Sequence, residues 1–403
     1  MKQRFLPATL MLALVISILS PFASAAPVEA GTTINVYNWG MYISDGTDGS
    51  INVNKAFTEA TGIKVNYITY DSNESMYTKL KTGGSTYDVI IPSDYMIARL
   101  IQEDMLEPIN FENVPNYQYV DQAFRDQPYD PDNQYSVPYT WGTVGLIYNA
   151  KHVTEEVTSW DTMWNPDYSG KILMFDNPRD SFAISELLLG YDLNTENPDE
   201  LTAAANKLKE QKPLVQSYVM DQIFATMERG EAWVAAYYAG DYLLMAQKNE
   251  DLKFCYPEEG FNVFIDAMCI PKGCQNKEAA EAYINFLCSP EISGQNMEYL
   301  GYSTPLSAAK AYMDPEIVNN PIAYPDEETL SRATSFMNLS TETTQQMDSL
   351  WLDVKTDTAA GDPGGSNTMI IVAAVLIAGV VILFIVANNN KRKKMAARKK
   401  AGQ

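Results

Sequence analysis

The sequence predicts an α/β protein with two lobes, and three observations indicate this. Short apolar runs rich in β-branched residues alternate along the chain with amphipathic segments, which is the order of elements in an α/β fold. About 330 of the 403 residues lie between the two terminal segments described below. This number exceeds what a single hydrophobic core usually contains, which indicates two lobes. No repeat or low-complexity tract interrupts this central part, so we expect strands and helices throughout it.

Three predicted strands, each followed by a predicted helix, occupy the first part of the chain. Gly62 stands where a glycine commonly ends a helix, and Asp71 and Glu74 suit the first turn of the next one. The strands are 34–39 (INVYNW), 63–70 (IKVNYITY) and 87–93 (YDVIIPS), and the helices are 51–60, 71–84 and about 94–103.

A second set of elements follows with the same alternation. Its predicted strands are 142–149 (GTVGLIYN), 171–176 (KILMFD), 231–238 (EAWVAAYY) and 252–257 (LKFCYP), with helices at 181–189 and 199–211. Polar and aromatic residues gather where these strands end. In open α/β sheets that edge is where ligands bind.

Both chain ends predict export and anchoring. Lys2 and Arg4 precede an apolar run and small residues up to Ala25, the layout of a secretory signal peptide over 1–25. A flexible polar linker at 357–368 leads to 369–387, an uncharged apolar stretch long enough to span a membrane as a helix. The basic tail at 388–403 places that end in the cytoplasm and the central part outside.

Charge and cysteine content narrow the function classes. The formal net charge is −22, although nine cations lie in the terminal segments; such a surface repels nucleic acid and attracts cations. Cysteines occur at 255, 269, 274 and 288 without CxxC spacing. Their apolar surroundings favour burial, but the sequence leaves open whether they form disulfides.

The residue patterns give no support for catalysis. The single histidine, His152, lies in a polar stretch, and no HExxH, GxSxG or GxxxxGK[ST] motif occurs. Acidic residues are abundant, but none is singled out as half of an acid/base pair. We therefore predict a binding protein that needs no cofactor and no metal, and not an enzyme.

An aromatic residue paired with an acid recurs at predicted strand ends. Such pairs suit an alkyl amine, since each ammonium needs a carboxylate where water is excluded and aromatic faces hold the methylenes. Taken singly, each aromatic could be core, and Asp94, Asp180 and Asp241 could each be a helix N-cap. The groups are Trp39 with Tyr42; Ser93, Asp94 and Tyr95; Asp176, Arg179 and Asp180; Tyr237, Tyr238 and Asp241; and Phe264 with Asp266.

These stretches resemble the spermidine/putrescine-binding proteins of bacterial ABC importers. The likeness is carried in order by VYNWGMYI, GIKVNYITYDSNESMYTKLKTG, YDVIIPSDY, YSVPYTWGTVGLIYN, SWDTMWNPDYSGKILMFDNPRDSF, EEGFNVFIDAMCIPKG and GYSTPLSAA. The resemblance implies a type II periplasmic-binding-protein fold, in which two α/β lobes close on a ligand. It places the first lobe at 31–142 with 265–302, and the second at 143–264 with 303–356.

The resemblance also implies roles for individual residues. Trp39 and Tyr42 correspond to an aromatic wall, and Phe264 with Asp266 to the pair that holds an amine. Tyr238 stands where a tryptophan is usual. The remaining implied ligand residues are Ser93, Tyr95, Asp180, Asp241 and Tyr302.

Two departures from the family bear on the ligand. The family usually has an acid at Met41, and Asn177 replaces an acid of the spermidine-binding branch; Asp94 could compensate. A diamine such as putrescine is therefore expected at least as much as spermidine, with another organic cation such as agmatine as an alternative. The partners implied are an ABC permease and the membrane, for a monomeric receptor; a polyamine sensor without transport is the other alternative.

Overall fold

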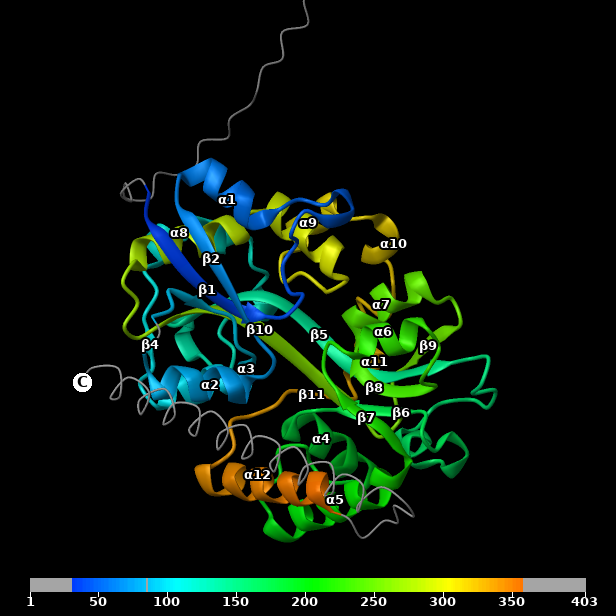
Figure 1. The fold of residues 1–403 in the computed structure, drawn as a ribbon. Coiled ribbons are helices and arrows are strands. Elements are labelled where there is room, and N and C mark those ends of the chain that lie inside the picture. The colour runs from blue at the N-terminus through cyan, green and yellow to red at the C-terminus, as the bar shows by residue number, and fades with distance from the viewer. Residues whose placement is uncertain (1–30, 85, 358–403) are drawn as a thin grey trace, which may run out of the picture.

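A computed structural model describes residues 31–84 and 86–357 (Figure 1). Its strands are β1 (Thr33–Trp39), β2 (Lys64–Tyr70), β3 (Val89–Ile90), β4 (Leu106–Glu107), β5 (Ser136–Asn149), β6 (Ile172–Phe175), β7 (Val215–Val219), β8 (Val234–Tyr238), β9 (Leu252–Cys255), β10 (Phe261–Pro271) and β11 (Ala333–Thr334).

The helices cover the strands on their outer sides, and short 3-10 helices occupy several connections. They are α1 (Val53–Thr61), α2 (Asn73–Thr82), α3 (Asp94–Gln102), α4 (Pro178–Leu188), α5 (Pro198–Gln211), α6 (Ile223–Glu228), α7 (Ala239–Lys248), α8 (Lys277–Leu287), α9 (Pro290–Leu300), α10 (Pro315–Val318), α11 (Glu327–Leu330) and α12 (Thr341–Thr356).

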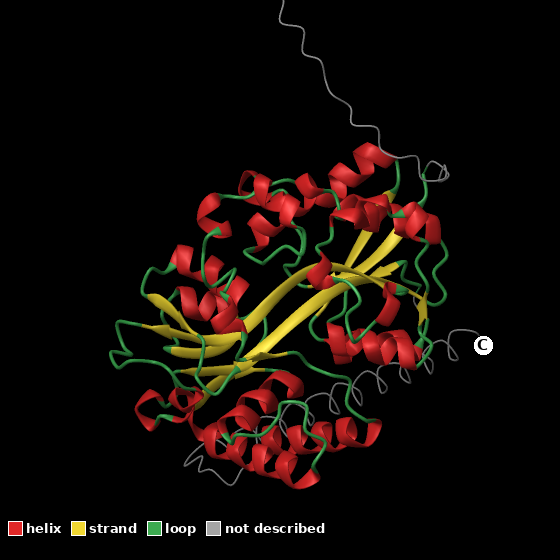
Figure 2. Ribbon diagram, turned by 180° about the vertical axis from the view of Figure 1, so that it is seen from behind, coloured by secondary structure: helices red, strands yellow, loops and turns green. Residues whose placement is uncertain are grey.

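Two long antiparallel strands, β5 and β10, join the two halves of the molecule (Figure 2). The strand order is β2-β1-β3-β10-β5-β8-β6-β7. On one side β1 pairs in parallel with β2 and β3, and on the other β6 pairs in parallel with β7 and β8. The carboxyl ends of the parallel strands therefore carry the loops that can meet a ligand.

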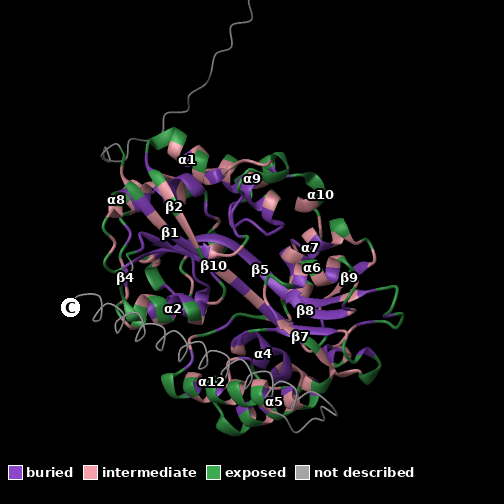
Figure 3. Cartoon of the chain, in the orientation of Figure 1, coloured by how far each residue is buried: buried purple, intermediate pink, exposed green. Residues whose placement is uncertain are grey.

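Separate hydrophobic cores define the two lobes of the structure. The first lobe packs around Ile34, Phe57 and Tyr283 on one face of its strands and around Tyr37 and Met96 on the other. Alternating residues of β1 enter these two cores, as the period of two in a strand requires. The second lobe packs around a larger core that includes Trp160, Phe175, Phe182, Tyr237 and Met347. Figure 3 shows the buried central strands beneath more exposed helices.

One segment packs differently from the expected lobe boundaries. Leu306, Ala309 and Met313 pack in the core of the first lobe, although 303–356 was expected in the second. We propose that the chain returns to the second lobe only after this segment.

Local signals explain most element boundaries. Gly62 adopts φ 76° as the C-cap of α1, as predicted, because a left-handed residue satisfies the last carbonyl groups of a helix. The expectation for Asp71 was wrong, since Ser72 is the N-cap of α2 and holds it through a capping box. β5 begins at Ser136, six residues before the predicted strand.

The second lobe holds the end of α12 tightly. This helix packs on α5, beside which Figure 1 shows it in orange. The Lys212 ammonium donates hydrogen bonds of 2.7 Å to the carbonyl oxygens of both Lys355 and Asp357. Lys355 in turn pairs with Asp176. The last described residues are thus fixed to the second lobe.

The structure answers some of the expectations about cysteines and membranes. Cys255, Cys269, Cys274 and Cys288 are free thiols, with the second and fourth fully buried. Among residues 31–84 and 86–357, no helix is both long and apolar enough to cross a membrane. The predicted signal peptide, the apolar segment 369–387 and the basic tail lie outside the described residues.

Candidate ligand-binding cleft

A cleft between the lobes contains almost all of the residues singled out in the sequence. It encloses about 820 Å³, including the part open to solvent, a size usual for small-molecule sites. Asp94 does not line it. From the predicted set its walls include Trp39, Met41, Tyr42, Ser93, Tyr95, Asn177, Asp180, Tyr238, Asp241, Phe264, Asp266 and Tyr302.

Asp266 is held by residues of the first lobe. The Tyr42 hydroxyl donates a hydrogen bond of 2.6 Å to Asp266 Oδ2, and Ser93 donates a second bond. The pairing of β10 with β5 shifts register between Asp266 and Ala267, where β5 carries the extra residue of a bulge, while Asp266 bridges to Ser93 through the backbone. We call Asp266, Tyr42 and Ser93 the Asp266 subsite.

The Asp266 carboxylate retains an unused hydrogen-bonding atom. Asp266 is 3% exposed, and its Oδ1 is buried without a partner among the described residues. Burial raises the pKa of this carboxyl to about 6, against the opposing effect of the Ser93 and Tyr42 hydrogen bonds; the charge of Asp180 raises it further. The unpaired Oδ1 atom can therefore accept a hydrogen bond from a cationic donor.

A polar network extends from this subsite along the first lobe. The Asn73 side-chain amide donates to Ser93 Oγ at 3.0 Å and to the Tyr95 hydroxyl at 3.1 Å. The Tyr95 hydroxyl donates to Glu74 Oε1 at 2.8 Å. Burial raises the pKa of Glu74, which lines the cleft as well. The network fixes side chains that could otherwise rotate, so this wall is preorganised.

Asp180 is held in the same way by the second lobe. Asn177 is the N-cap of α4 and accepts from the Asp180 backbone N–H at 2.8 Å, while its amide donates to Asp180 Oδ2 at 2.8 Å. The Tyr238 hydroxyl donates to the same oxygen at 3.1 Å. Burial raises the pKa of Asp180 to about 6, and these hydrogen bonds oppose the rise.

Asp241 differs because its partner comes from the opposite lobe. Asp241 lies in the first turn of α7 in the second lobe, and it accepts a hydrogen bond from Tyr302, whose ring packs in the first. Burial raises the pKa of Asp241 to about 8, and the nearby charge of Asp221 contributes. We call Asp241, Asp221 and Tyr302 the Asp241 subsite.

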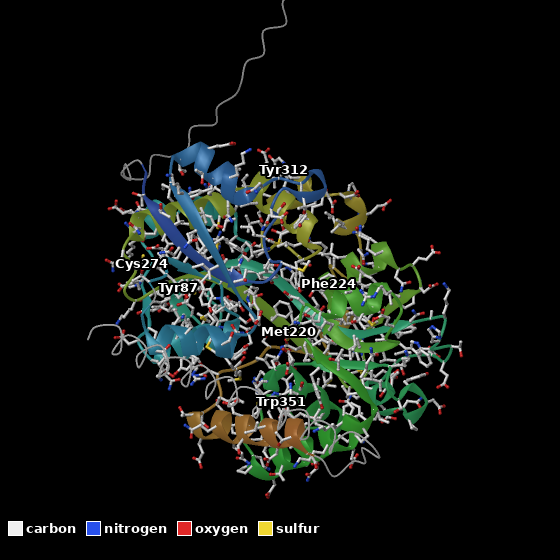
Figure 4. All side chains as sticks on the ribbon, viewed as in Figure 1. Tyr87, Met220, Phe224, Cys274, Tyr312 and Trp351 are labelled. Carbon is white, nitrogen blue, oxygen red and sulfur yellow. The ribbon has the colours of Figure 1, made fainter. Side chains whose placement is uncertain are left out.

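Aromatic rings line the space around these acids. Phe264 meets Tyr238 edge-on at 5.5 Å between ring centroids, and Tyr42 meets Tyr302 at 5.2 Å. The Trp39 indole donates to the Ile91 carbonyl at 2.9 Å, which fixes the orientation of its ring. Such faces hold methylene groups and attract cations. Figure 4 labels Met220 and Phe224, which add apolar surface to the lining.

The residues named as departures take three different positions. Met41 is 63% exposed, and its backbone φ is 48°, a value that residues other than glycine rarely adopt. Asn177 caps α4 and orients Asp180, as described above. The buried Asp94 accepts from the backbone N–H groups of Tyr95 at 2.7 Å and Ile265 at 3.3 Å, so its carboxylate joins α3 to β10.

Helix capping does not account for the three aspartates that could have been N-caps. Asp94, Asp180 and Asp241 each lie in the first turn of a helix, but the N-cap positions belong to Ser93, Asn177 and Tyr238.

Sequence reasoning missed several residues of the lining. Glu74 and Asp221 are the charged ones that matter here, with Asp71 also at the wall; Asn262 and Phe336 are others. Glu74 had been assigned to a helix start, and Asp221 follows a strand end that was not predicted. No lysine, arginine or histidine lines the cleft in the described part of the chain, so the site selects for positive charge.

The described residues contain no cluster of metal-ligating side chains. Within the described ranges, no group of three or more His, Cys, Asp or Glu side chains could hold a metal ion. The arrangement of carboxylates, hydroxyl groups and rings can bind and enclose a cation.

The chain is similar to known proteins over most of its length. Residues 52–325 match the family described as bacterial extracellular solute-binding protein. The chain is 36% identical over 309 residues to the spermidine/putrescine-binding periplasmic protein of Escherichia coli strain K12, covering 76% of this chain and 87% of that one. It is 31% identical over 375 residues to a putrescine-binding periplasmic protein of Pseudomonas aeruginosa, covering 88% and 100%.

A solved structure supports the same relationship. The putative spermidine/putrescine ABC transporter from Listeria monocytogenes matches with a TM-score of 0.77 at 37% identity, covering 81% of this chain and 99% of that one. The predicted α/β periplasmic-binding-protein fold is therefore confirmed.

Proposed function

The chain belongs to the bacterial extracellular solute-binding proteins, which are binding proteins and not enzymes, and from this premise we propose that it binds a polyamine, putrescine or spermidine, for import by an ABC transporter. The observation that carries the proposal is the cleft itself, in which Asp180, Asp241 and Asp266 face aromatic rings with no basic residue in the described lining. The names of the relatives support the same ligand class.

The two carboxylate subsites favour a ligand with at least two ammonium groups. The charge of Asp180 raises the pKa of Asp266, and the charge of Asp221 raises the pKa of Asp241. An ammonium placed between two carboxylates offsets both, while the aromatic rings hold the methylenes that join it to the next ammonium. A neutral sugar would leave these acids uncompensated. In this proposal the two lobes close on the ligand in the type II manner.

Membrane attachment and delivery form the second part of the proposal. The uncharged segment 369–387, followed by seven cations, would anchor a monomeric receptor with its lobes outside the cytoplasm. A tether keeps the receptor near its permease at a high effective concentration. Full-length protein should stay with membranes washed in alkaline carbonate, and a variant ending at residue 368 should be released. Release of both would contradict the anchor.

A ligand panel tests the binding proposal directly. We expect putrescine or spermidine to raise the melting temperature of the purified protein, since a ligand that binds only the folded state stabilises it. Agmatine tests the alternative cation, and a neutral sugar is the negative control. If agmatine alone acts, the ligand assignment is wrong; if no amine acts, the proposed function is wrong.

A further inference from the structure

Asp221 presents a carboxylate at the cleft, and no residue of 31–84 or 86–357 pairs with it. It lies between β7 and α6 in the second lobe and belongs to the lining. No hydrogen bond or ion pair of its carboxylate occurs within the described residues. Burial raises the pKa of Asp221, and the charge of Asp71 from the first lobe adds to the rise. Two acids from opposite lobes thus lie near one another, and the described lining of the cleft contains no basic side chain.

The Asp221 side chain also reaches the first lobe. A Cβ atom added at Gly40 would overlap Asp221 Oδ2. Gly40 does not adopt a positive φ, so the absence of a side chain there gives space and not a special backbone conformation. The neighbouring Met41 provides no charge. The carboxylate beside Gly40 and Met41 is therefore that of Asp221, from the second lobe.

Asp221 and Asp241 act on the same part of the cleft. The charge of Asp221 raises the pKa of Asp241, and both residues lie in the second lobe. From these contacts we propose that Asp221 is a specificity-determining residue, which with Asp241 forms a two-carboxylate subsite for one terminal ammonium of the ligand. This inference rests on the proposed function, because it presupposes that an amine enters the cleft.

A ligand with one ammonium provides the sharpest test. Putrescine and 4-aminobutan-1-ol have chains of the same length, but the second carries a hydroxyl group in place of one ammonium. Calorimetry should show that the wild-type protein prefers putrescine. In Asp221→Asn, which keeps the shape and removes the charge, we expect that preference to fall about tenfold, since specificity is a difference between two affinities.

A matched control removes a charge from the same element. Glu228 ends α6 and does not line the cleft, so Glu228→Gln should keep the wild-type preference. Circular dichroism checks that both variants fold. A putrescine preference in Asp221→Asn within twofold of wild type would overturn this inference alone. A wild-type protein that binds no polyamine would overturn the proposed function on which it rests.

Discussion

The Asp266 and Asp241 subsites place a carboxylate in the same cleft by different means. Asp266 takes its hydrogen bonds from Tyr42 and Ser93, both in its own lobe. Asp241 takes its hydrogen bond from Tyr302 in the other lobe, and Asp221 beside it lies against Gly40 across the cleft. The first subsite is complete within one lobe, whereas the second needs both.

This difference assigns the two subsites different roles, one in initial binding of the ligand and the other in closure of the lobes. A preformed subsite loses little conformational entropy when a ligand arrives, so the Asp266 subsite is suited to hold an amine first. A subsite made by two lobes favours the arrangement in which those lobes meet, because its contacts exist only there. The following predictions test this division of roles.

The largest effect is expected at Asp266. Asp266→Asn keeps the shape but leaves a bound ammonium underpaired in a buried place. Breaking a buried pair costs about 3–5 kcal/mol, on the order of a hundred- to several-thousand-fold in affinity. Calorimetry with putrescine and spermidine measures it. Binding within about threefold of wild type would show that Asp266 does not hold the amine.

Affinity should rise with pH in two steps, a lower one from Asp266 and Asp180 and a higher one from Asp241. The pKa values of Asp266 and Asp180 are raised to about 6, and that of Asp241 to about 8. A bound ammonium favours the ionised carboxylates, so binding releases protons and strengthens as pH rises from 5 to 8.5, by about tenfold or more. Asp241→Asn should remove the step above pH 7 and retain the lower one. Affinity independent of pH would contradict the assignment.

Folding stability should change in the opposite direction. These pKa values in the folded protein lie above the ordinary aspartate value, so the stabilisation they contribute is present at low pH and is lost as pH rises through 6 and then 8. Urea unfolding without added polyamine should show this loss in the wild type. Its part above pH 7 should shrink in Asp241→Asn.

A smaller effect is expected where the lobes meet. In Gly40→Ala, the new methyl group should push the flexible Asp221 side chain aside. We expect a loss of putrescine affinity of about tenfold, equivalent to about 1.4 kcal/mol. Because both changes remove the same contribution, Gly40→Ala combined with Asp221→Asn should bind no more weakly than either alone. Additive losses would mean that the two residues act independently.

The smallest effect on binding is expected at Asp94. This residue is buried, its pKa is raised to about 8 by burial, and it accepts from two backbone N–H groups away from the cleft. Asp94→Asn should therefore change polyamine affinity by less than about threefold, under 1 kcal/mol. Its cost should appear in urea unfolding, at about 1 kcal/mol. A large loss of affinity with unchanged stability would place Asp94 among the ligand residues.

Sequence patterns predicted the parts of the molecule that depend on local signals. The start of α3 at Asp94 and the end of α5 at Gln211 agree with the expected boundaries, and most of the aromatic and acidic residues at strand ends line one cleft, although Asp94 and Asp176 do not. These features follow from periodicity, capping and the edge of the sheet, together with a resemblance that spans the lobes.

Long-range geometry accounts for what the patterns missed. The strand β5 begins at Ser136 and not at the predicted residue 142. It includes Pro138, which lies next to an irregularity in the pairing with β10, where a missing N–H is tolerated. Asp221 and Glu74 had no local mark of function, since acids are common at helix starts. Their place in the cleft is set by how the two lobes pack.

The hydrogen bonds and the ion pair that hold the end of α12 have a mechanical consequence. Lys212 and Asp176 fix Lys355 to the second lobe, so the described part of the chain ends at that lobe. If the proposed anchor is present, it holds the second lobe in position relative to the membrane. Under the proposed closure, the first lobe then moves toward the second, and the proposed permease would detect that movement.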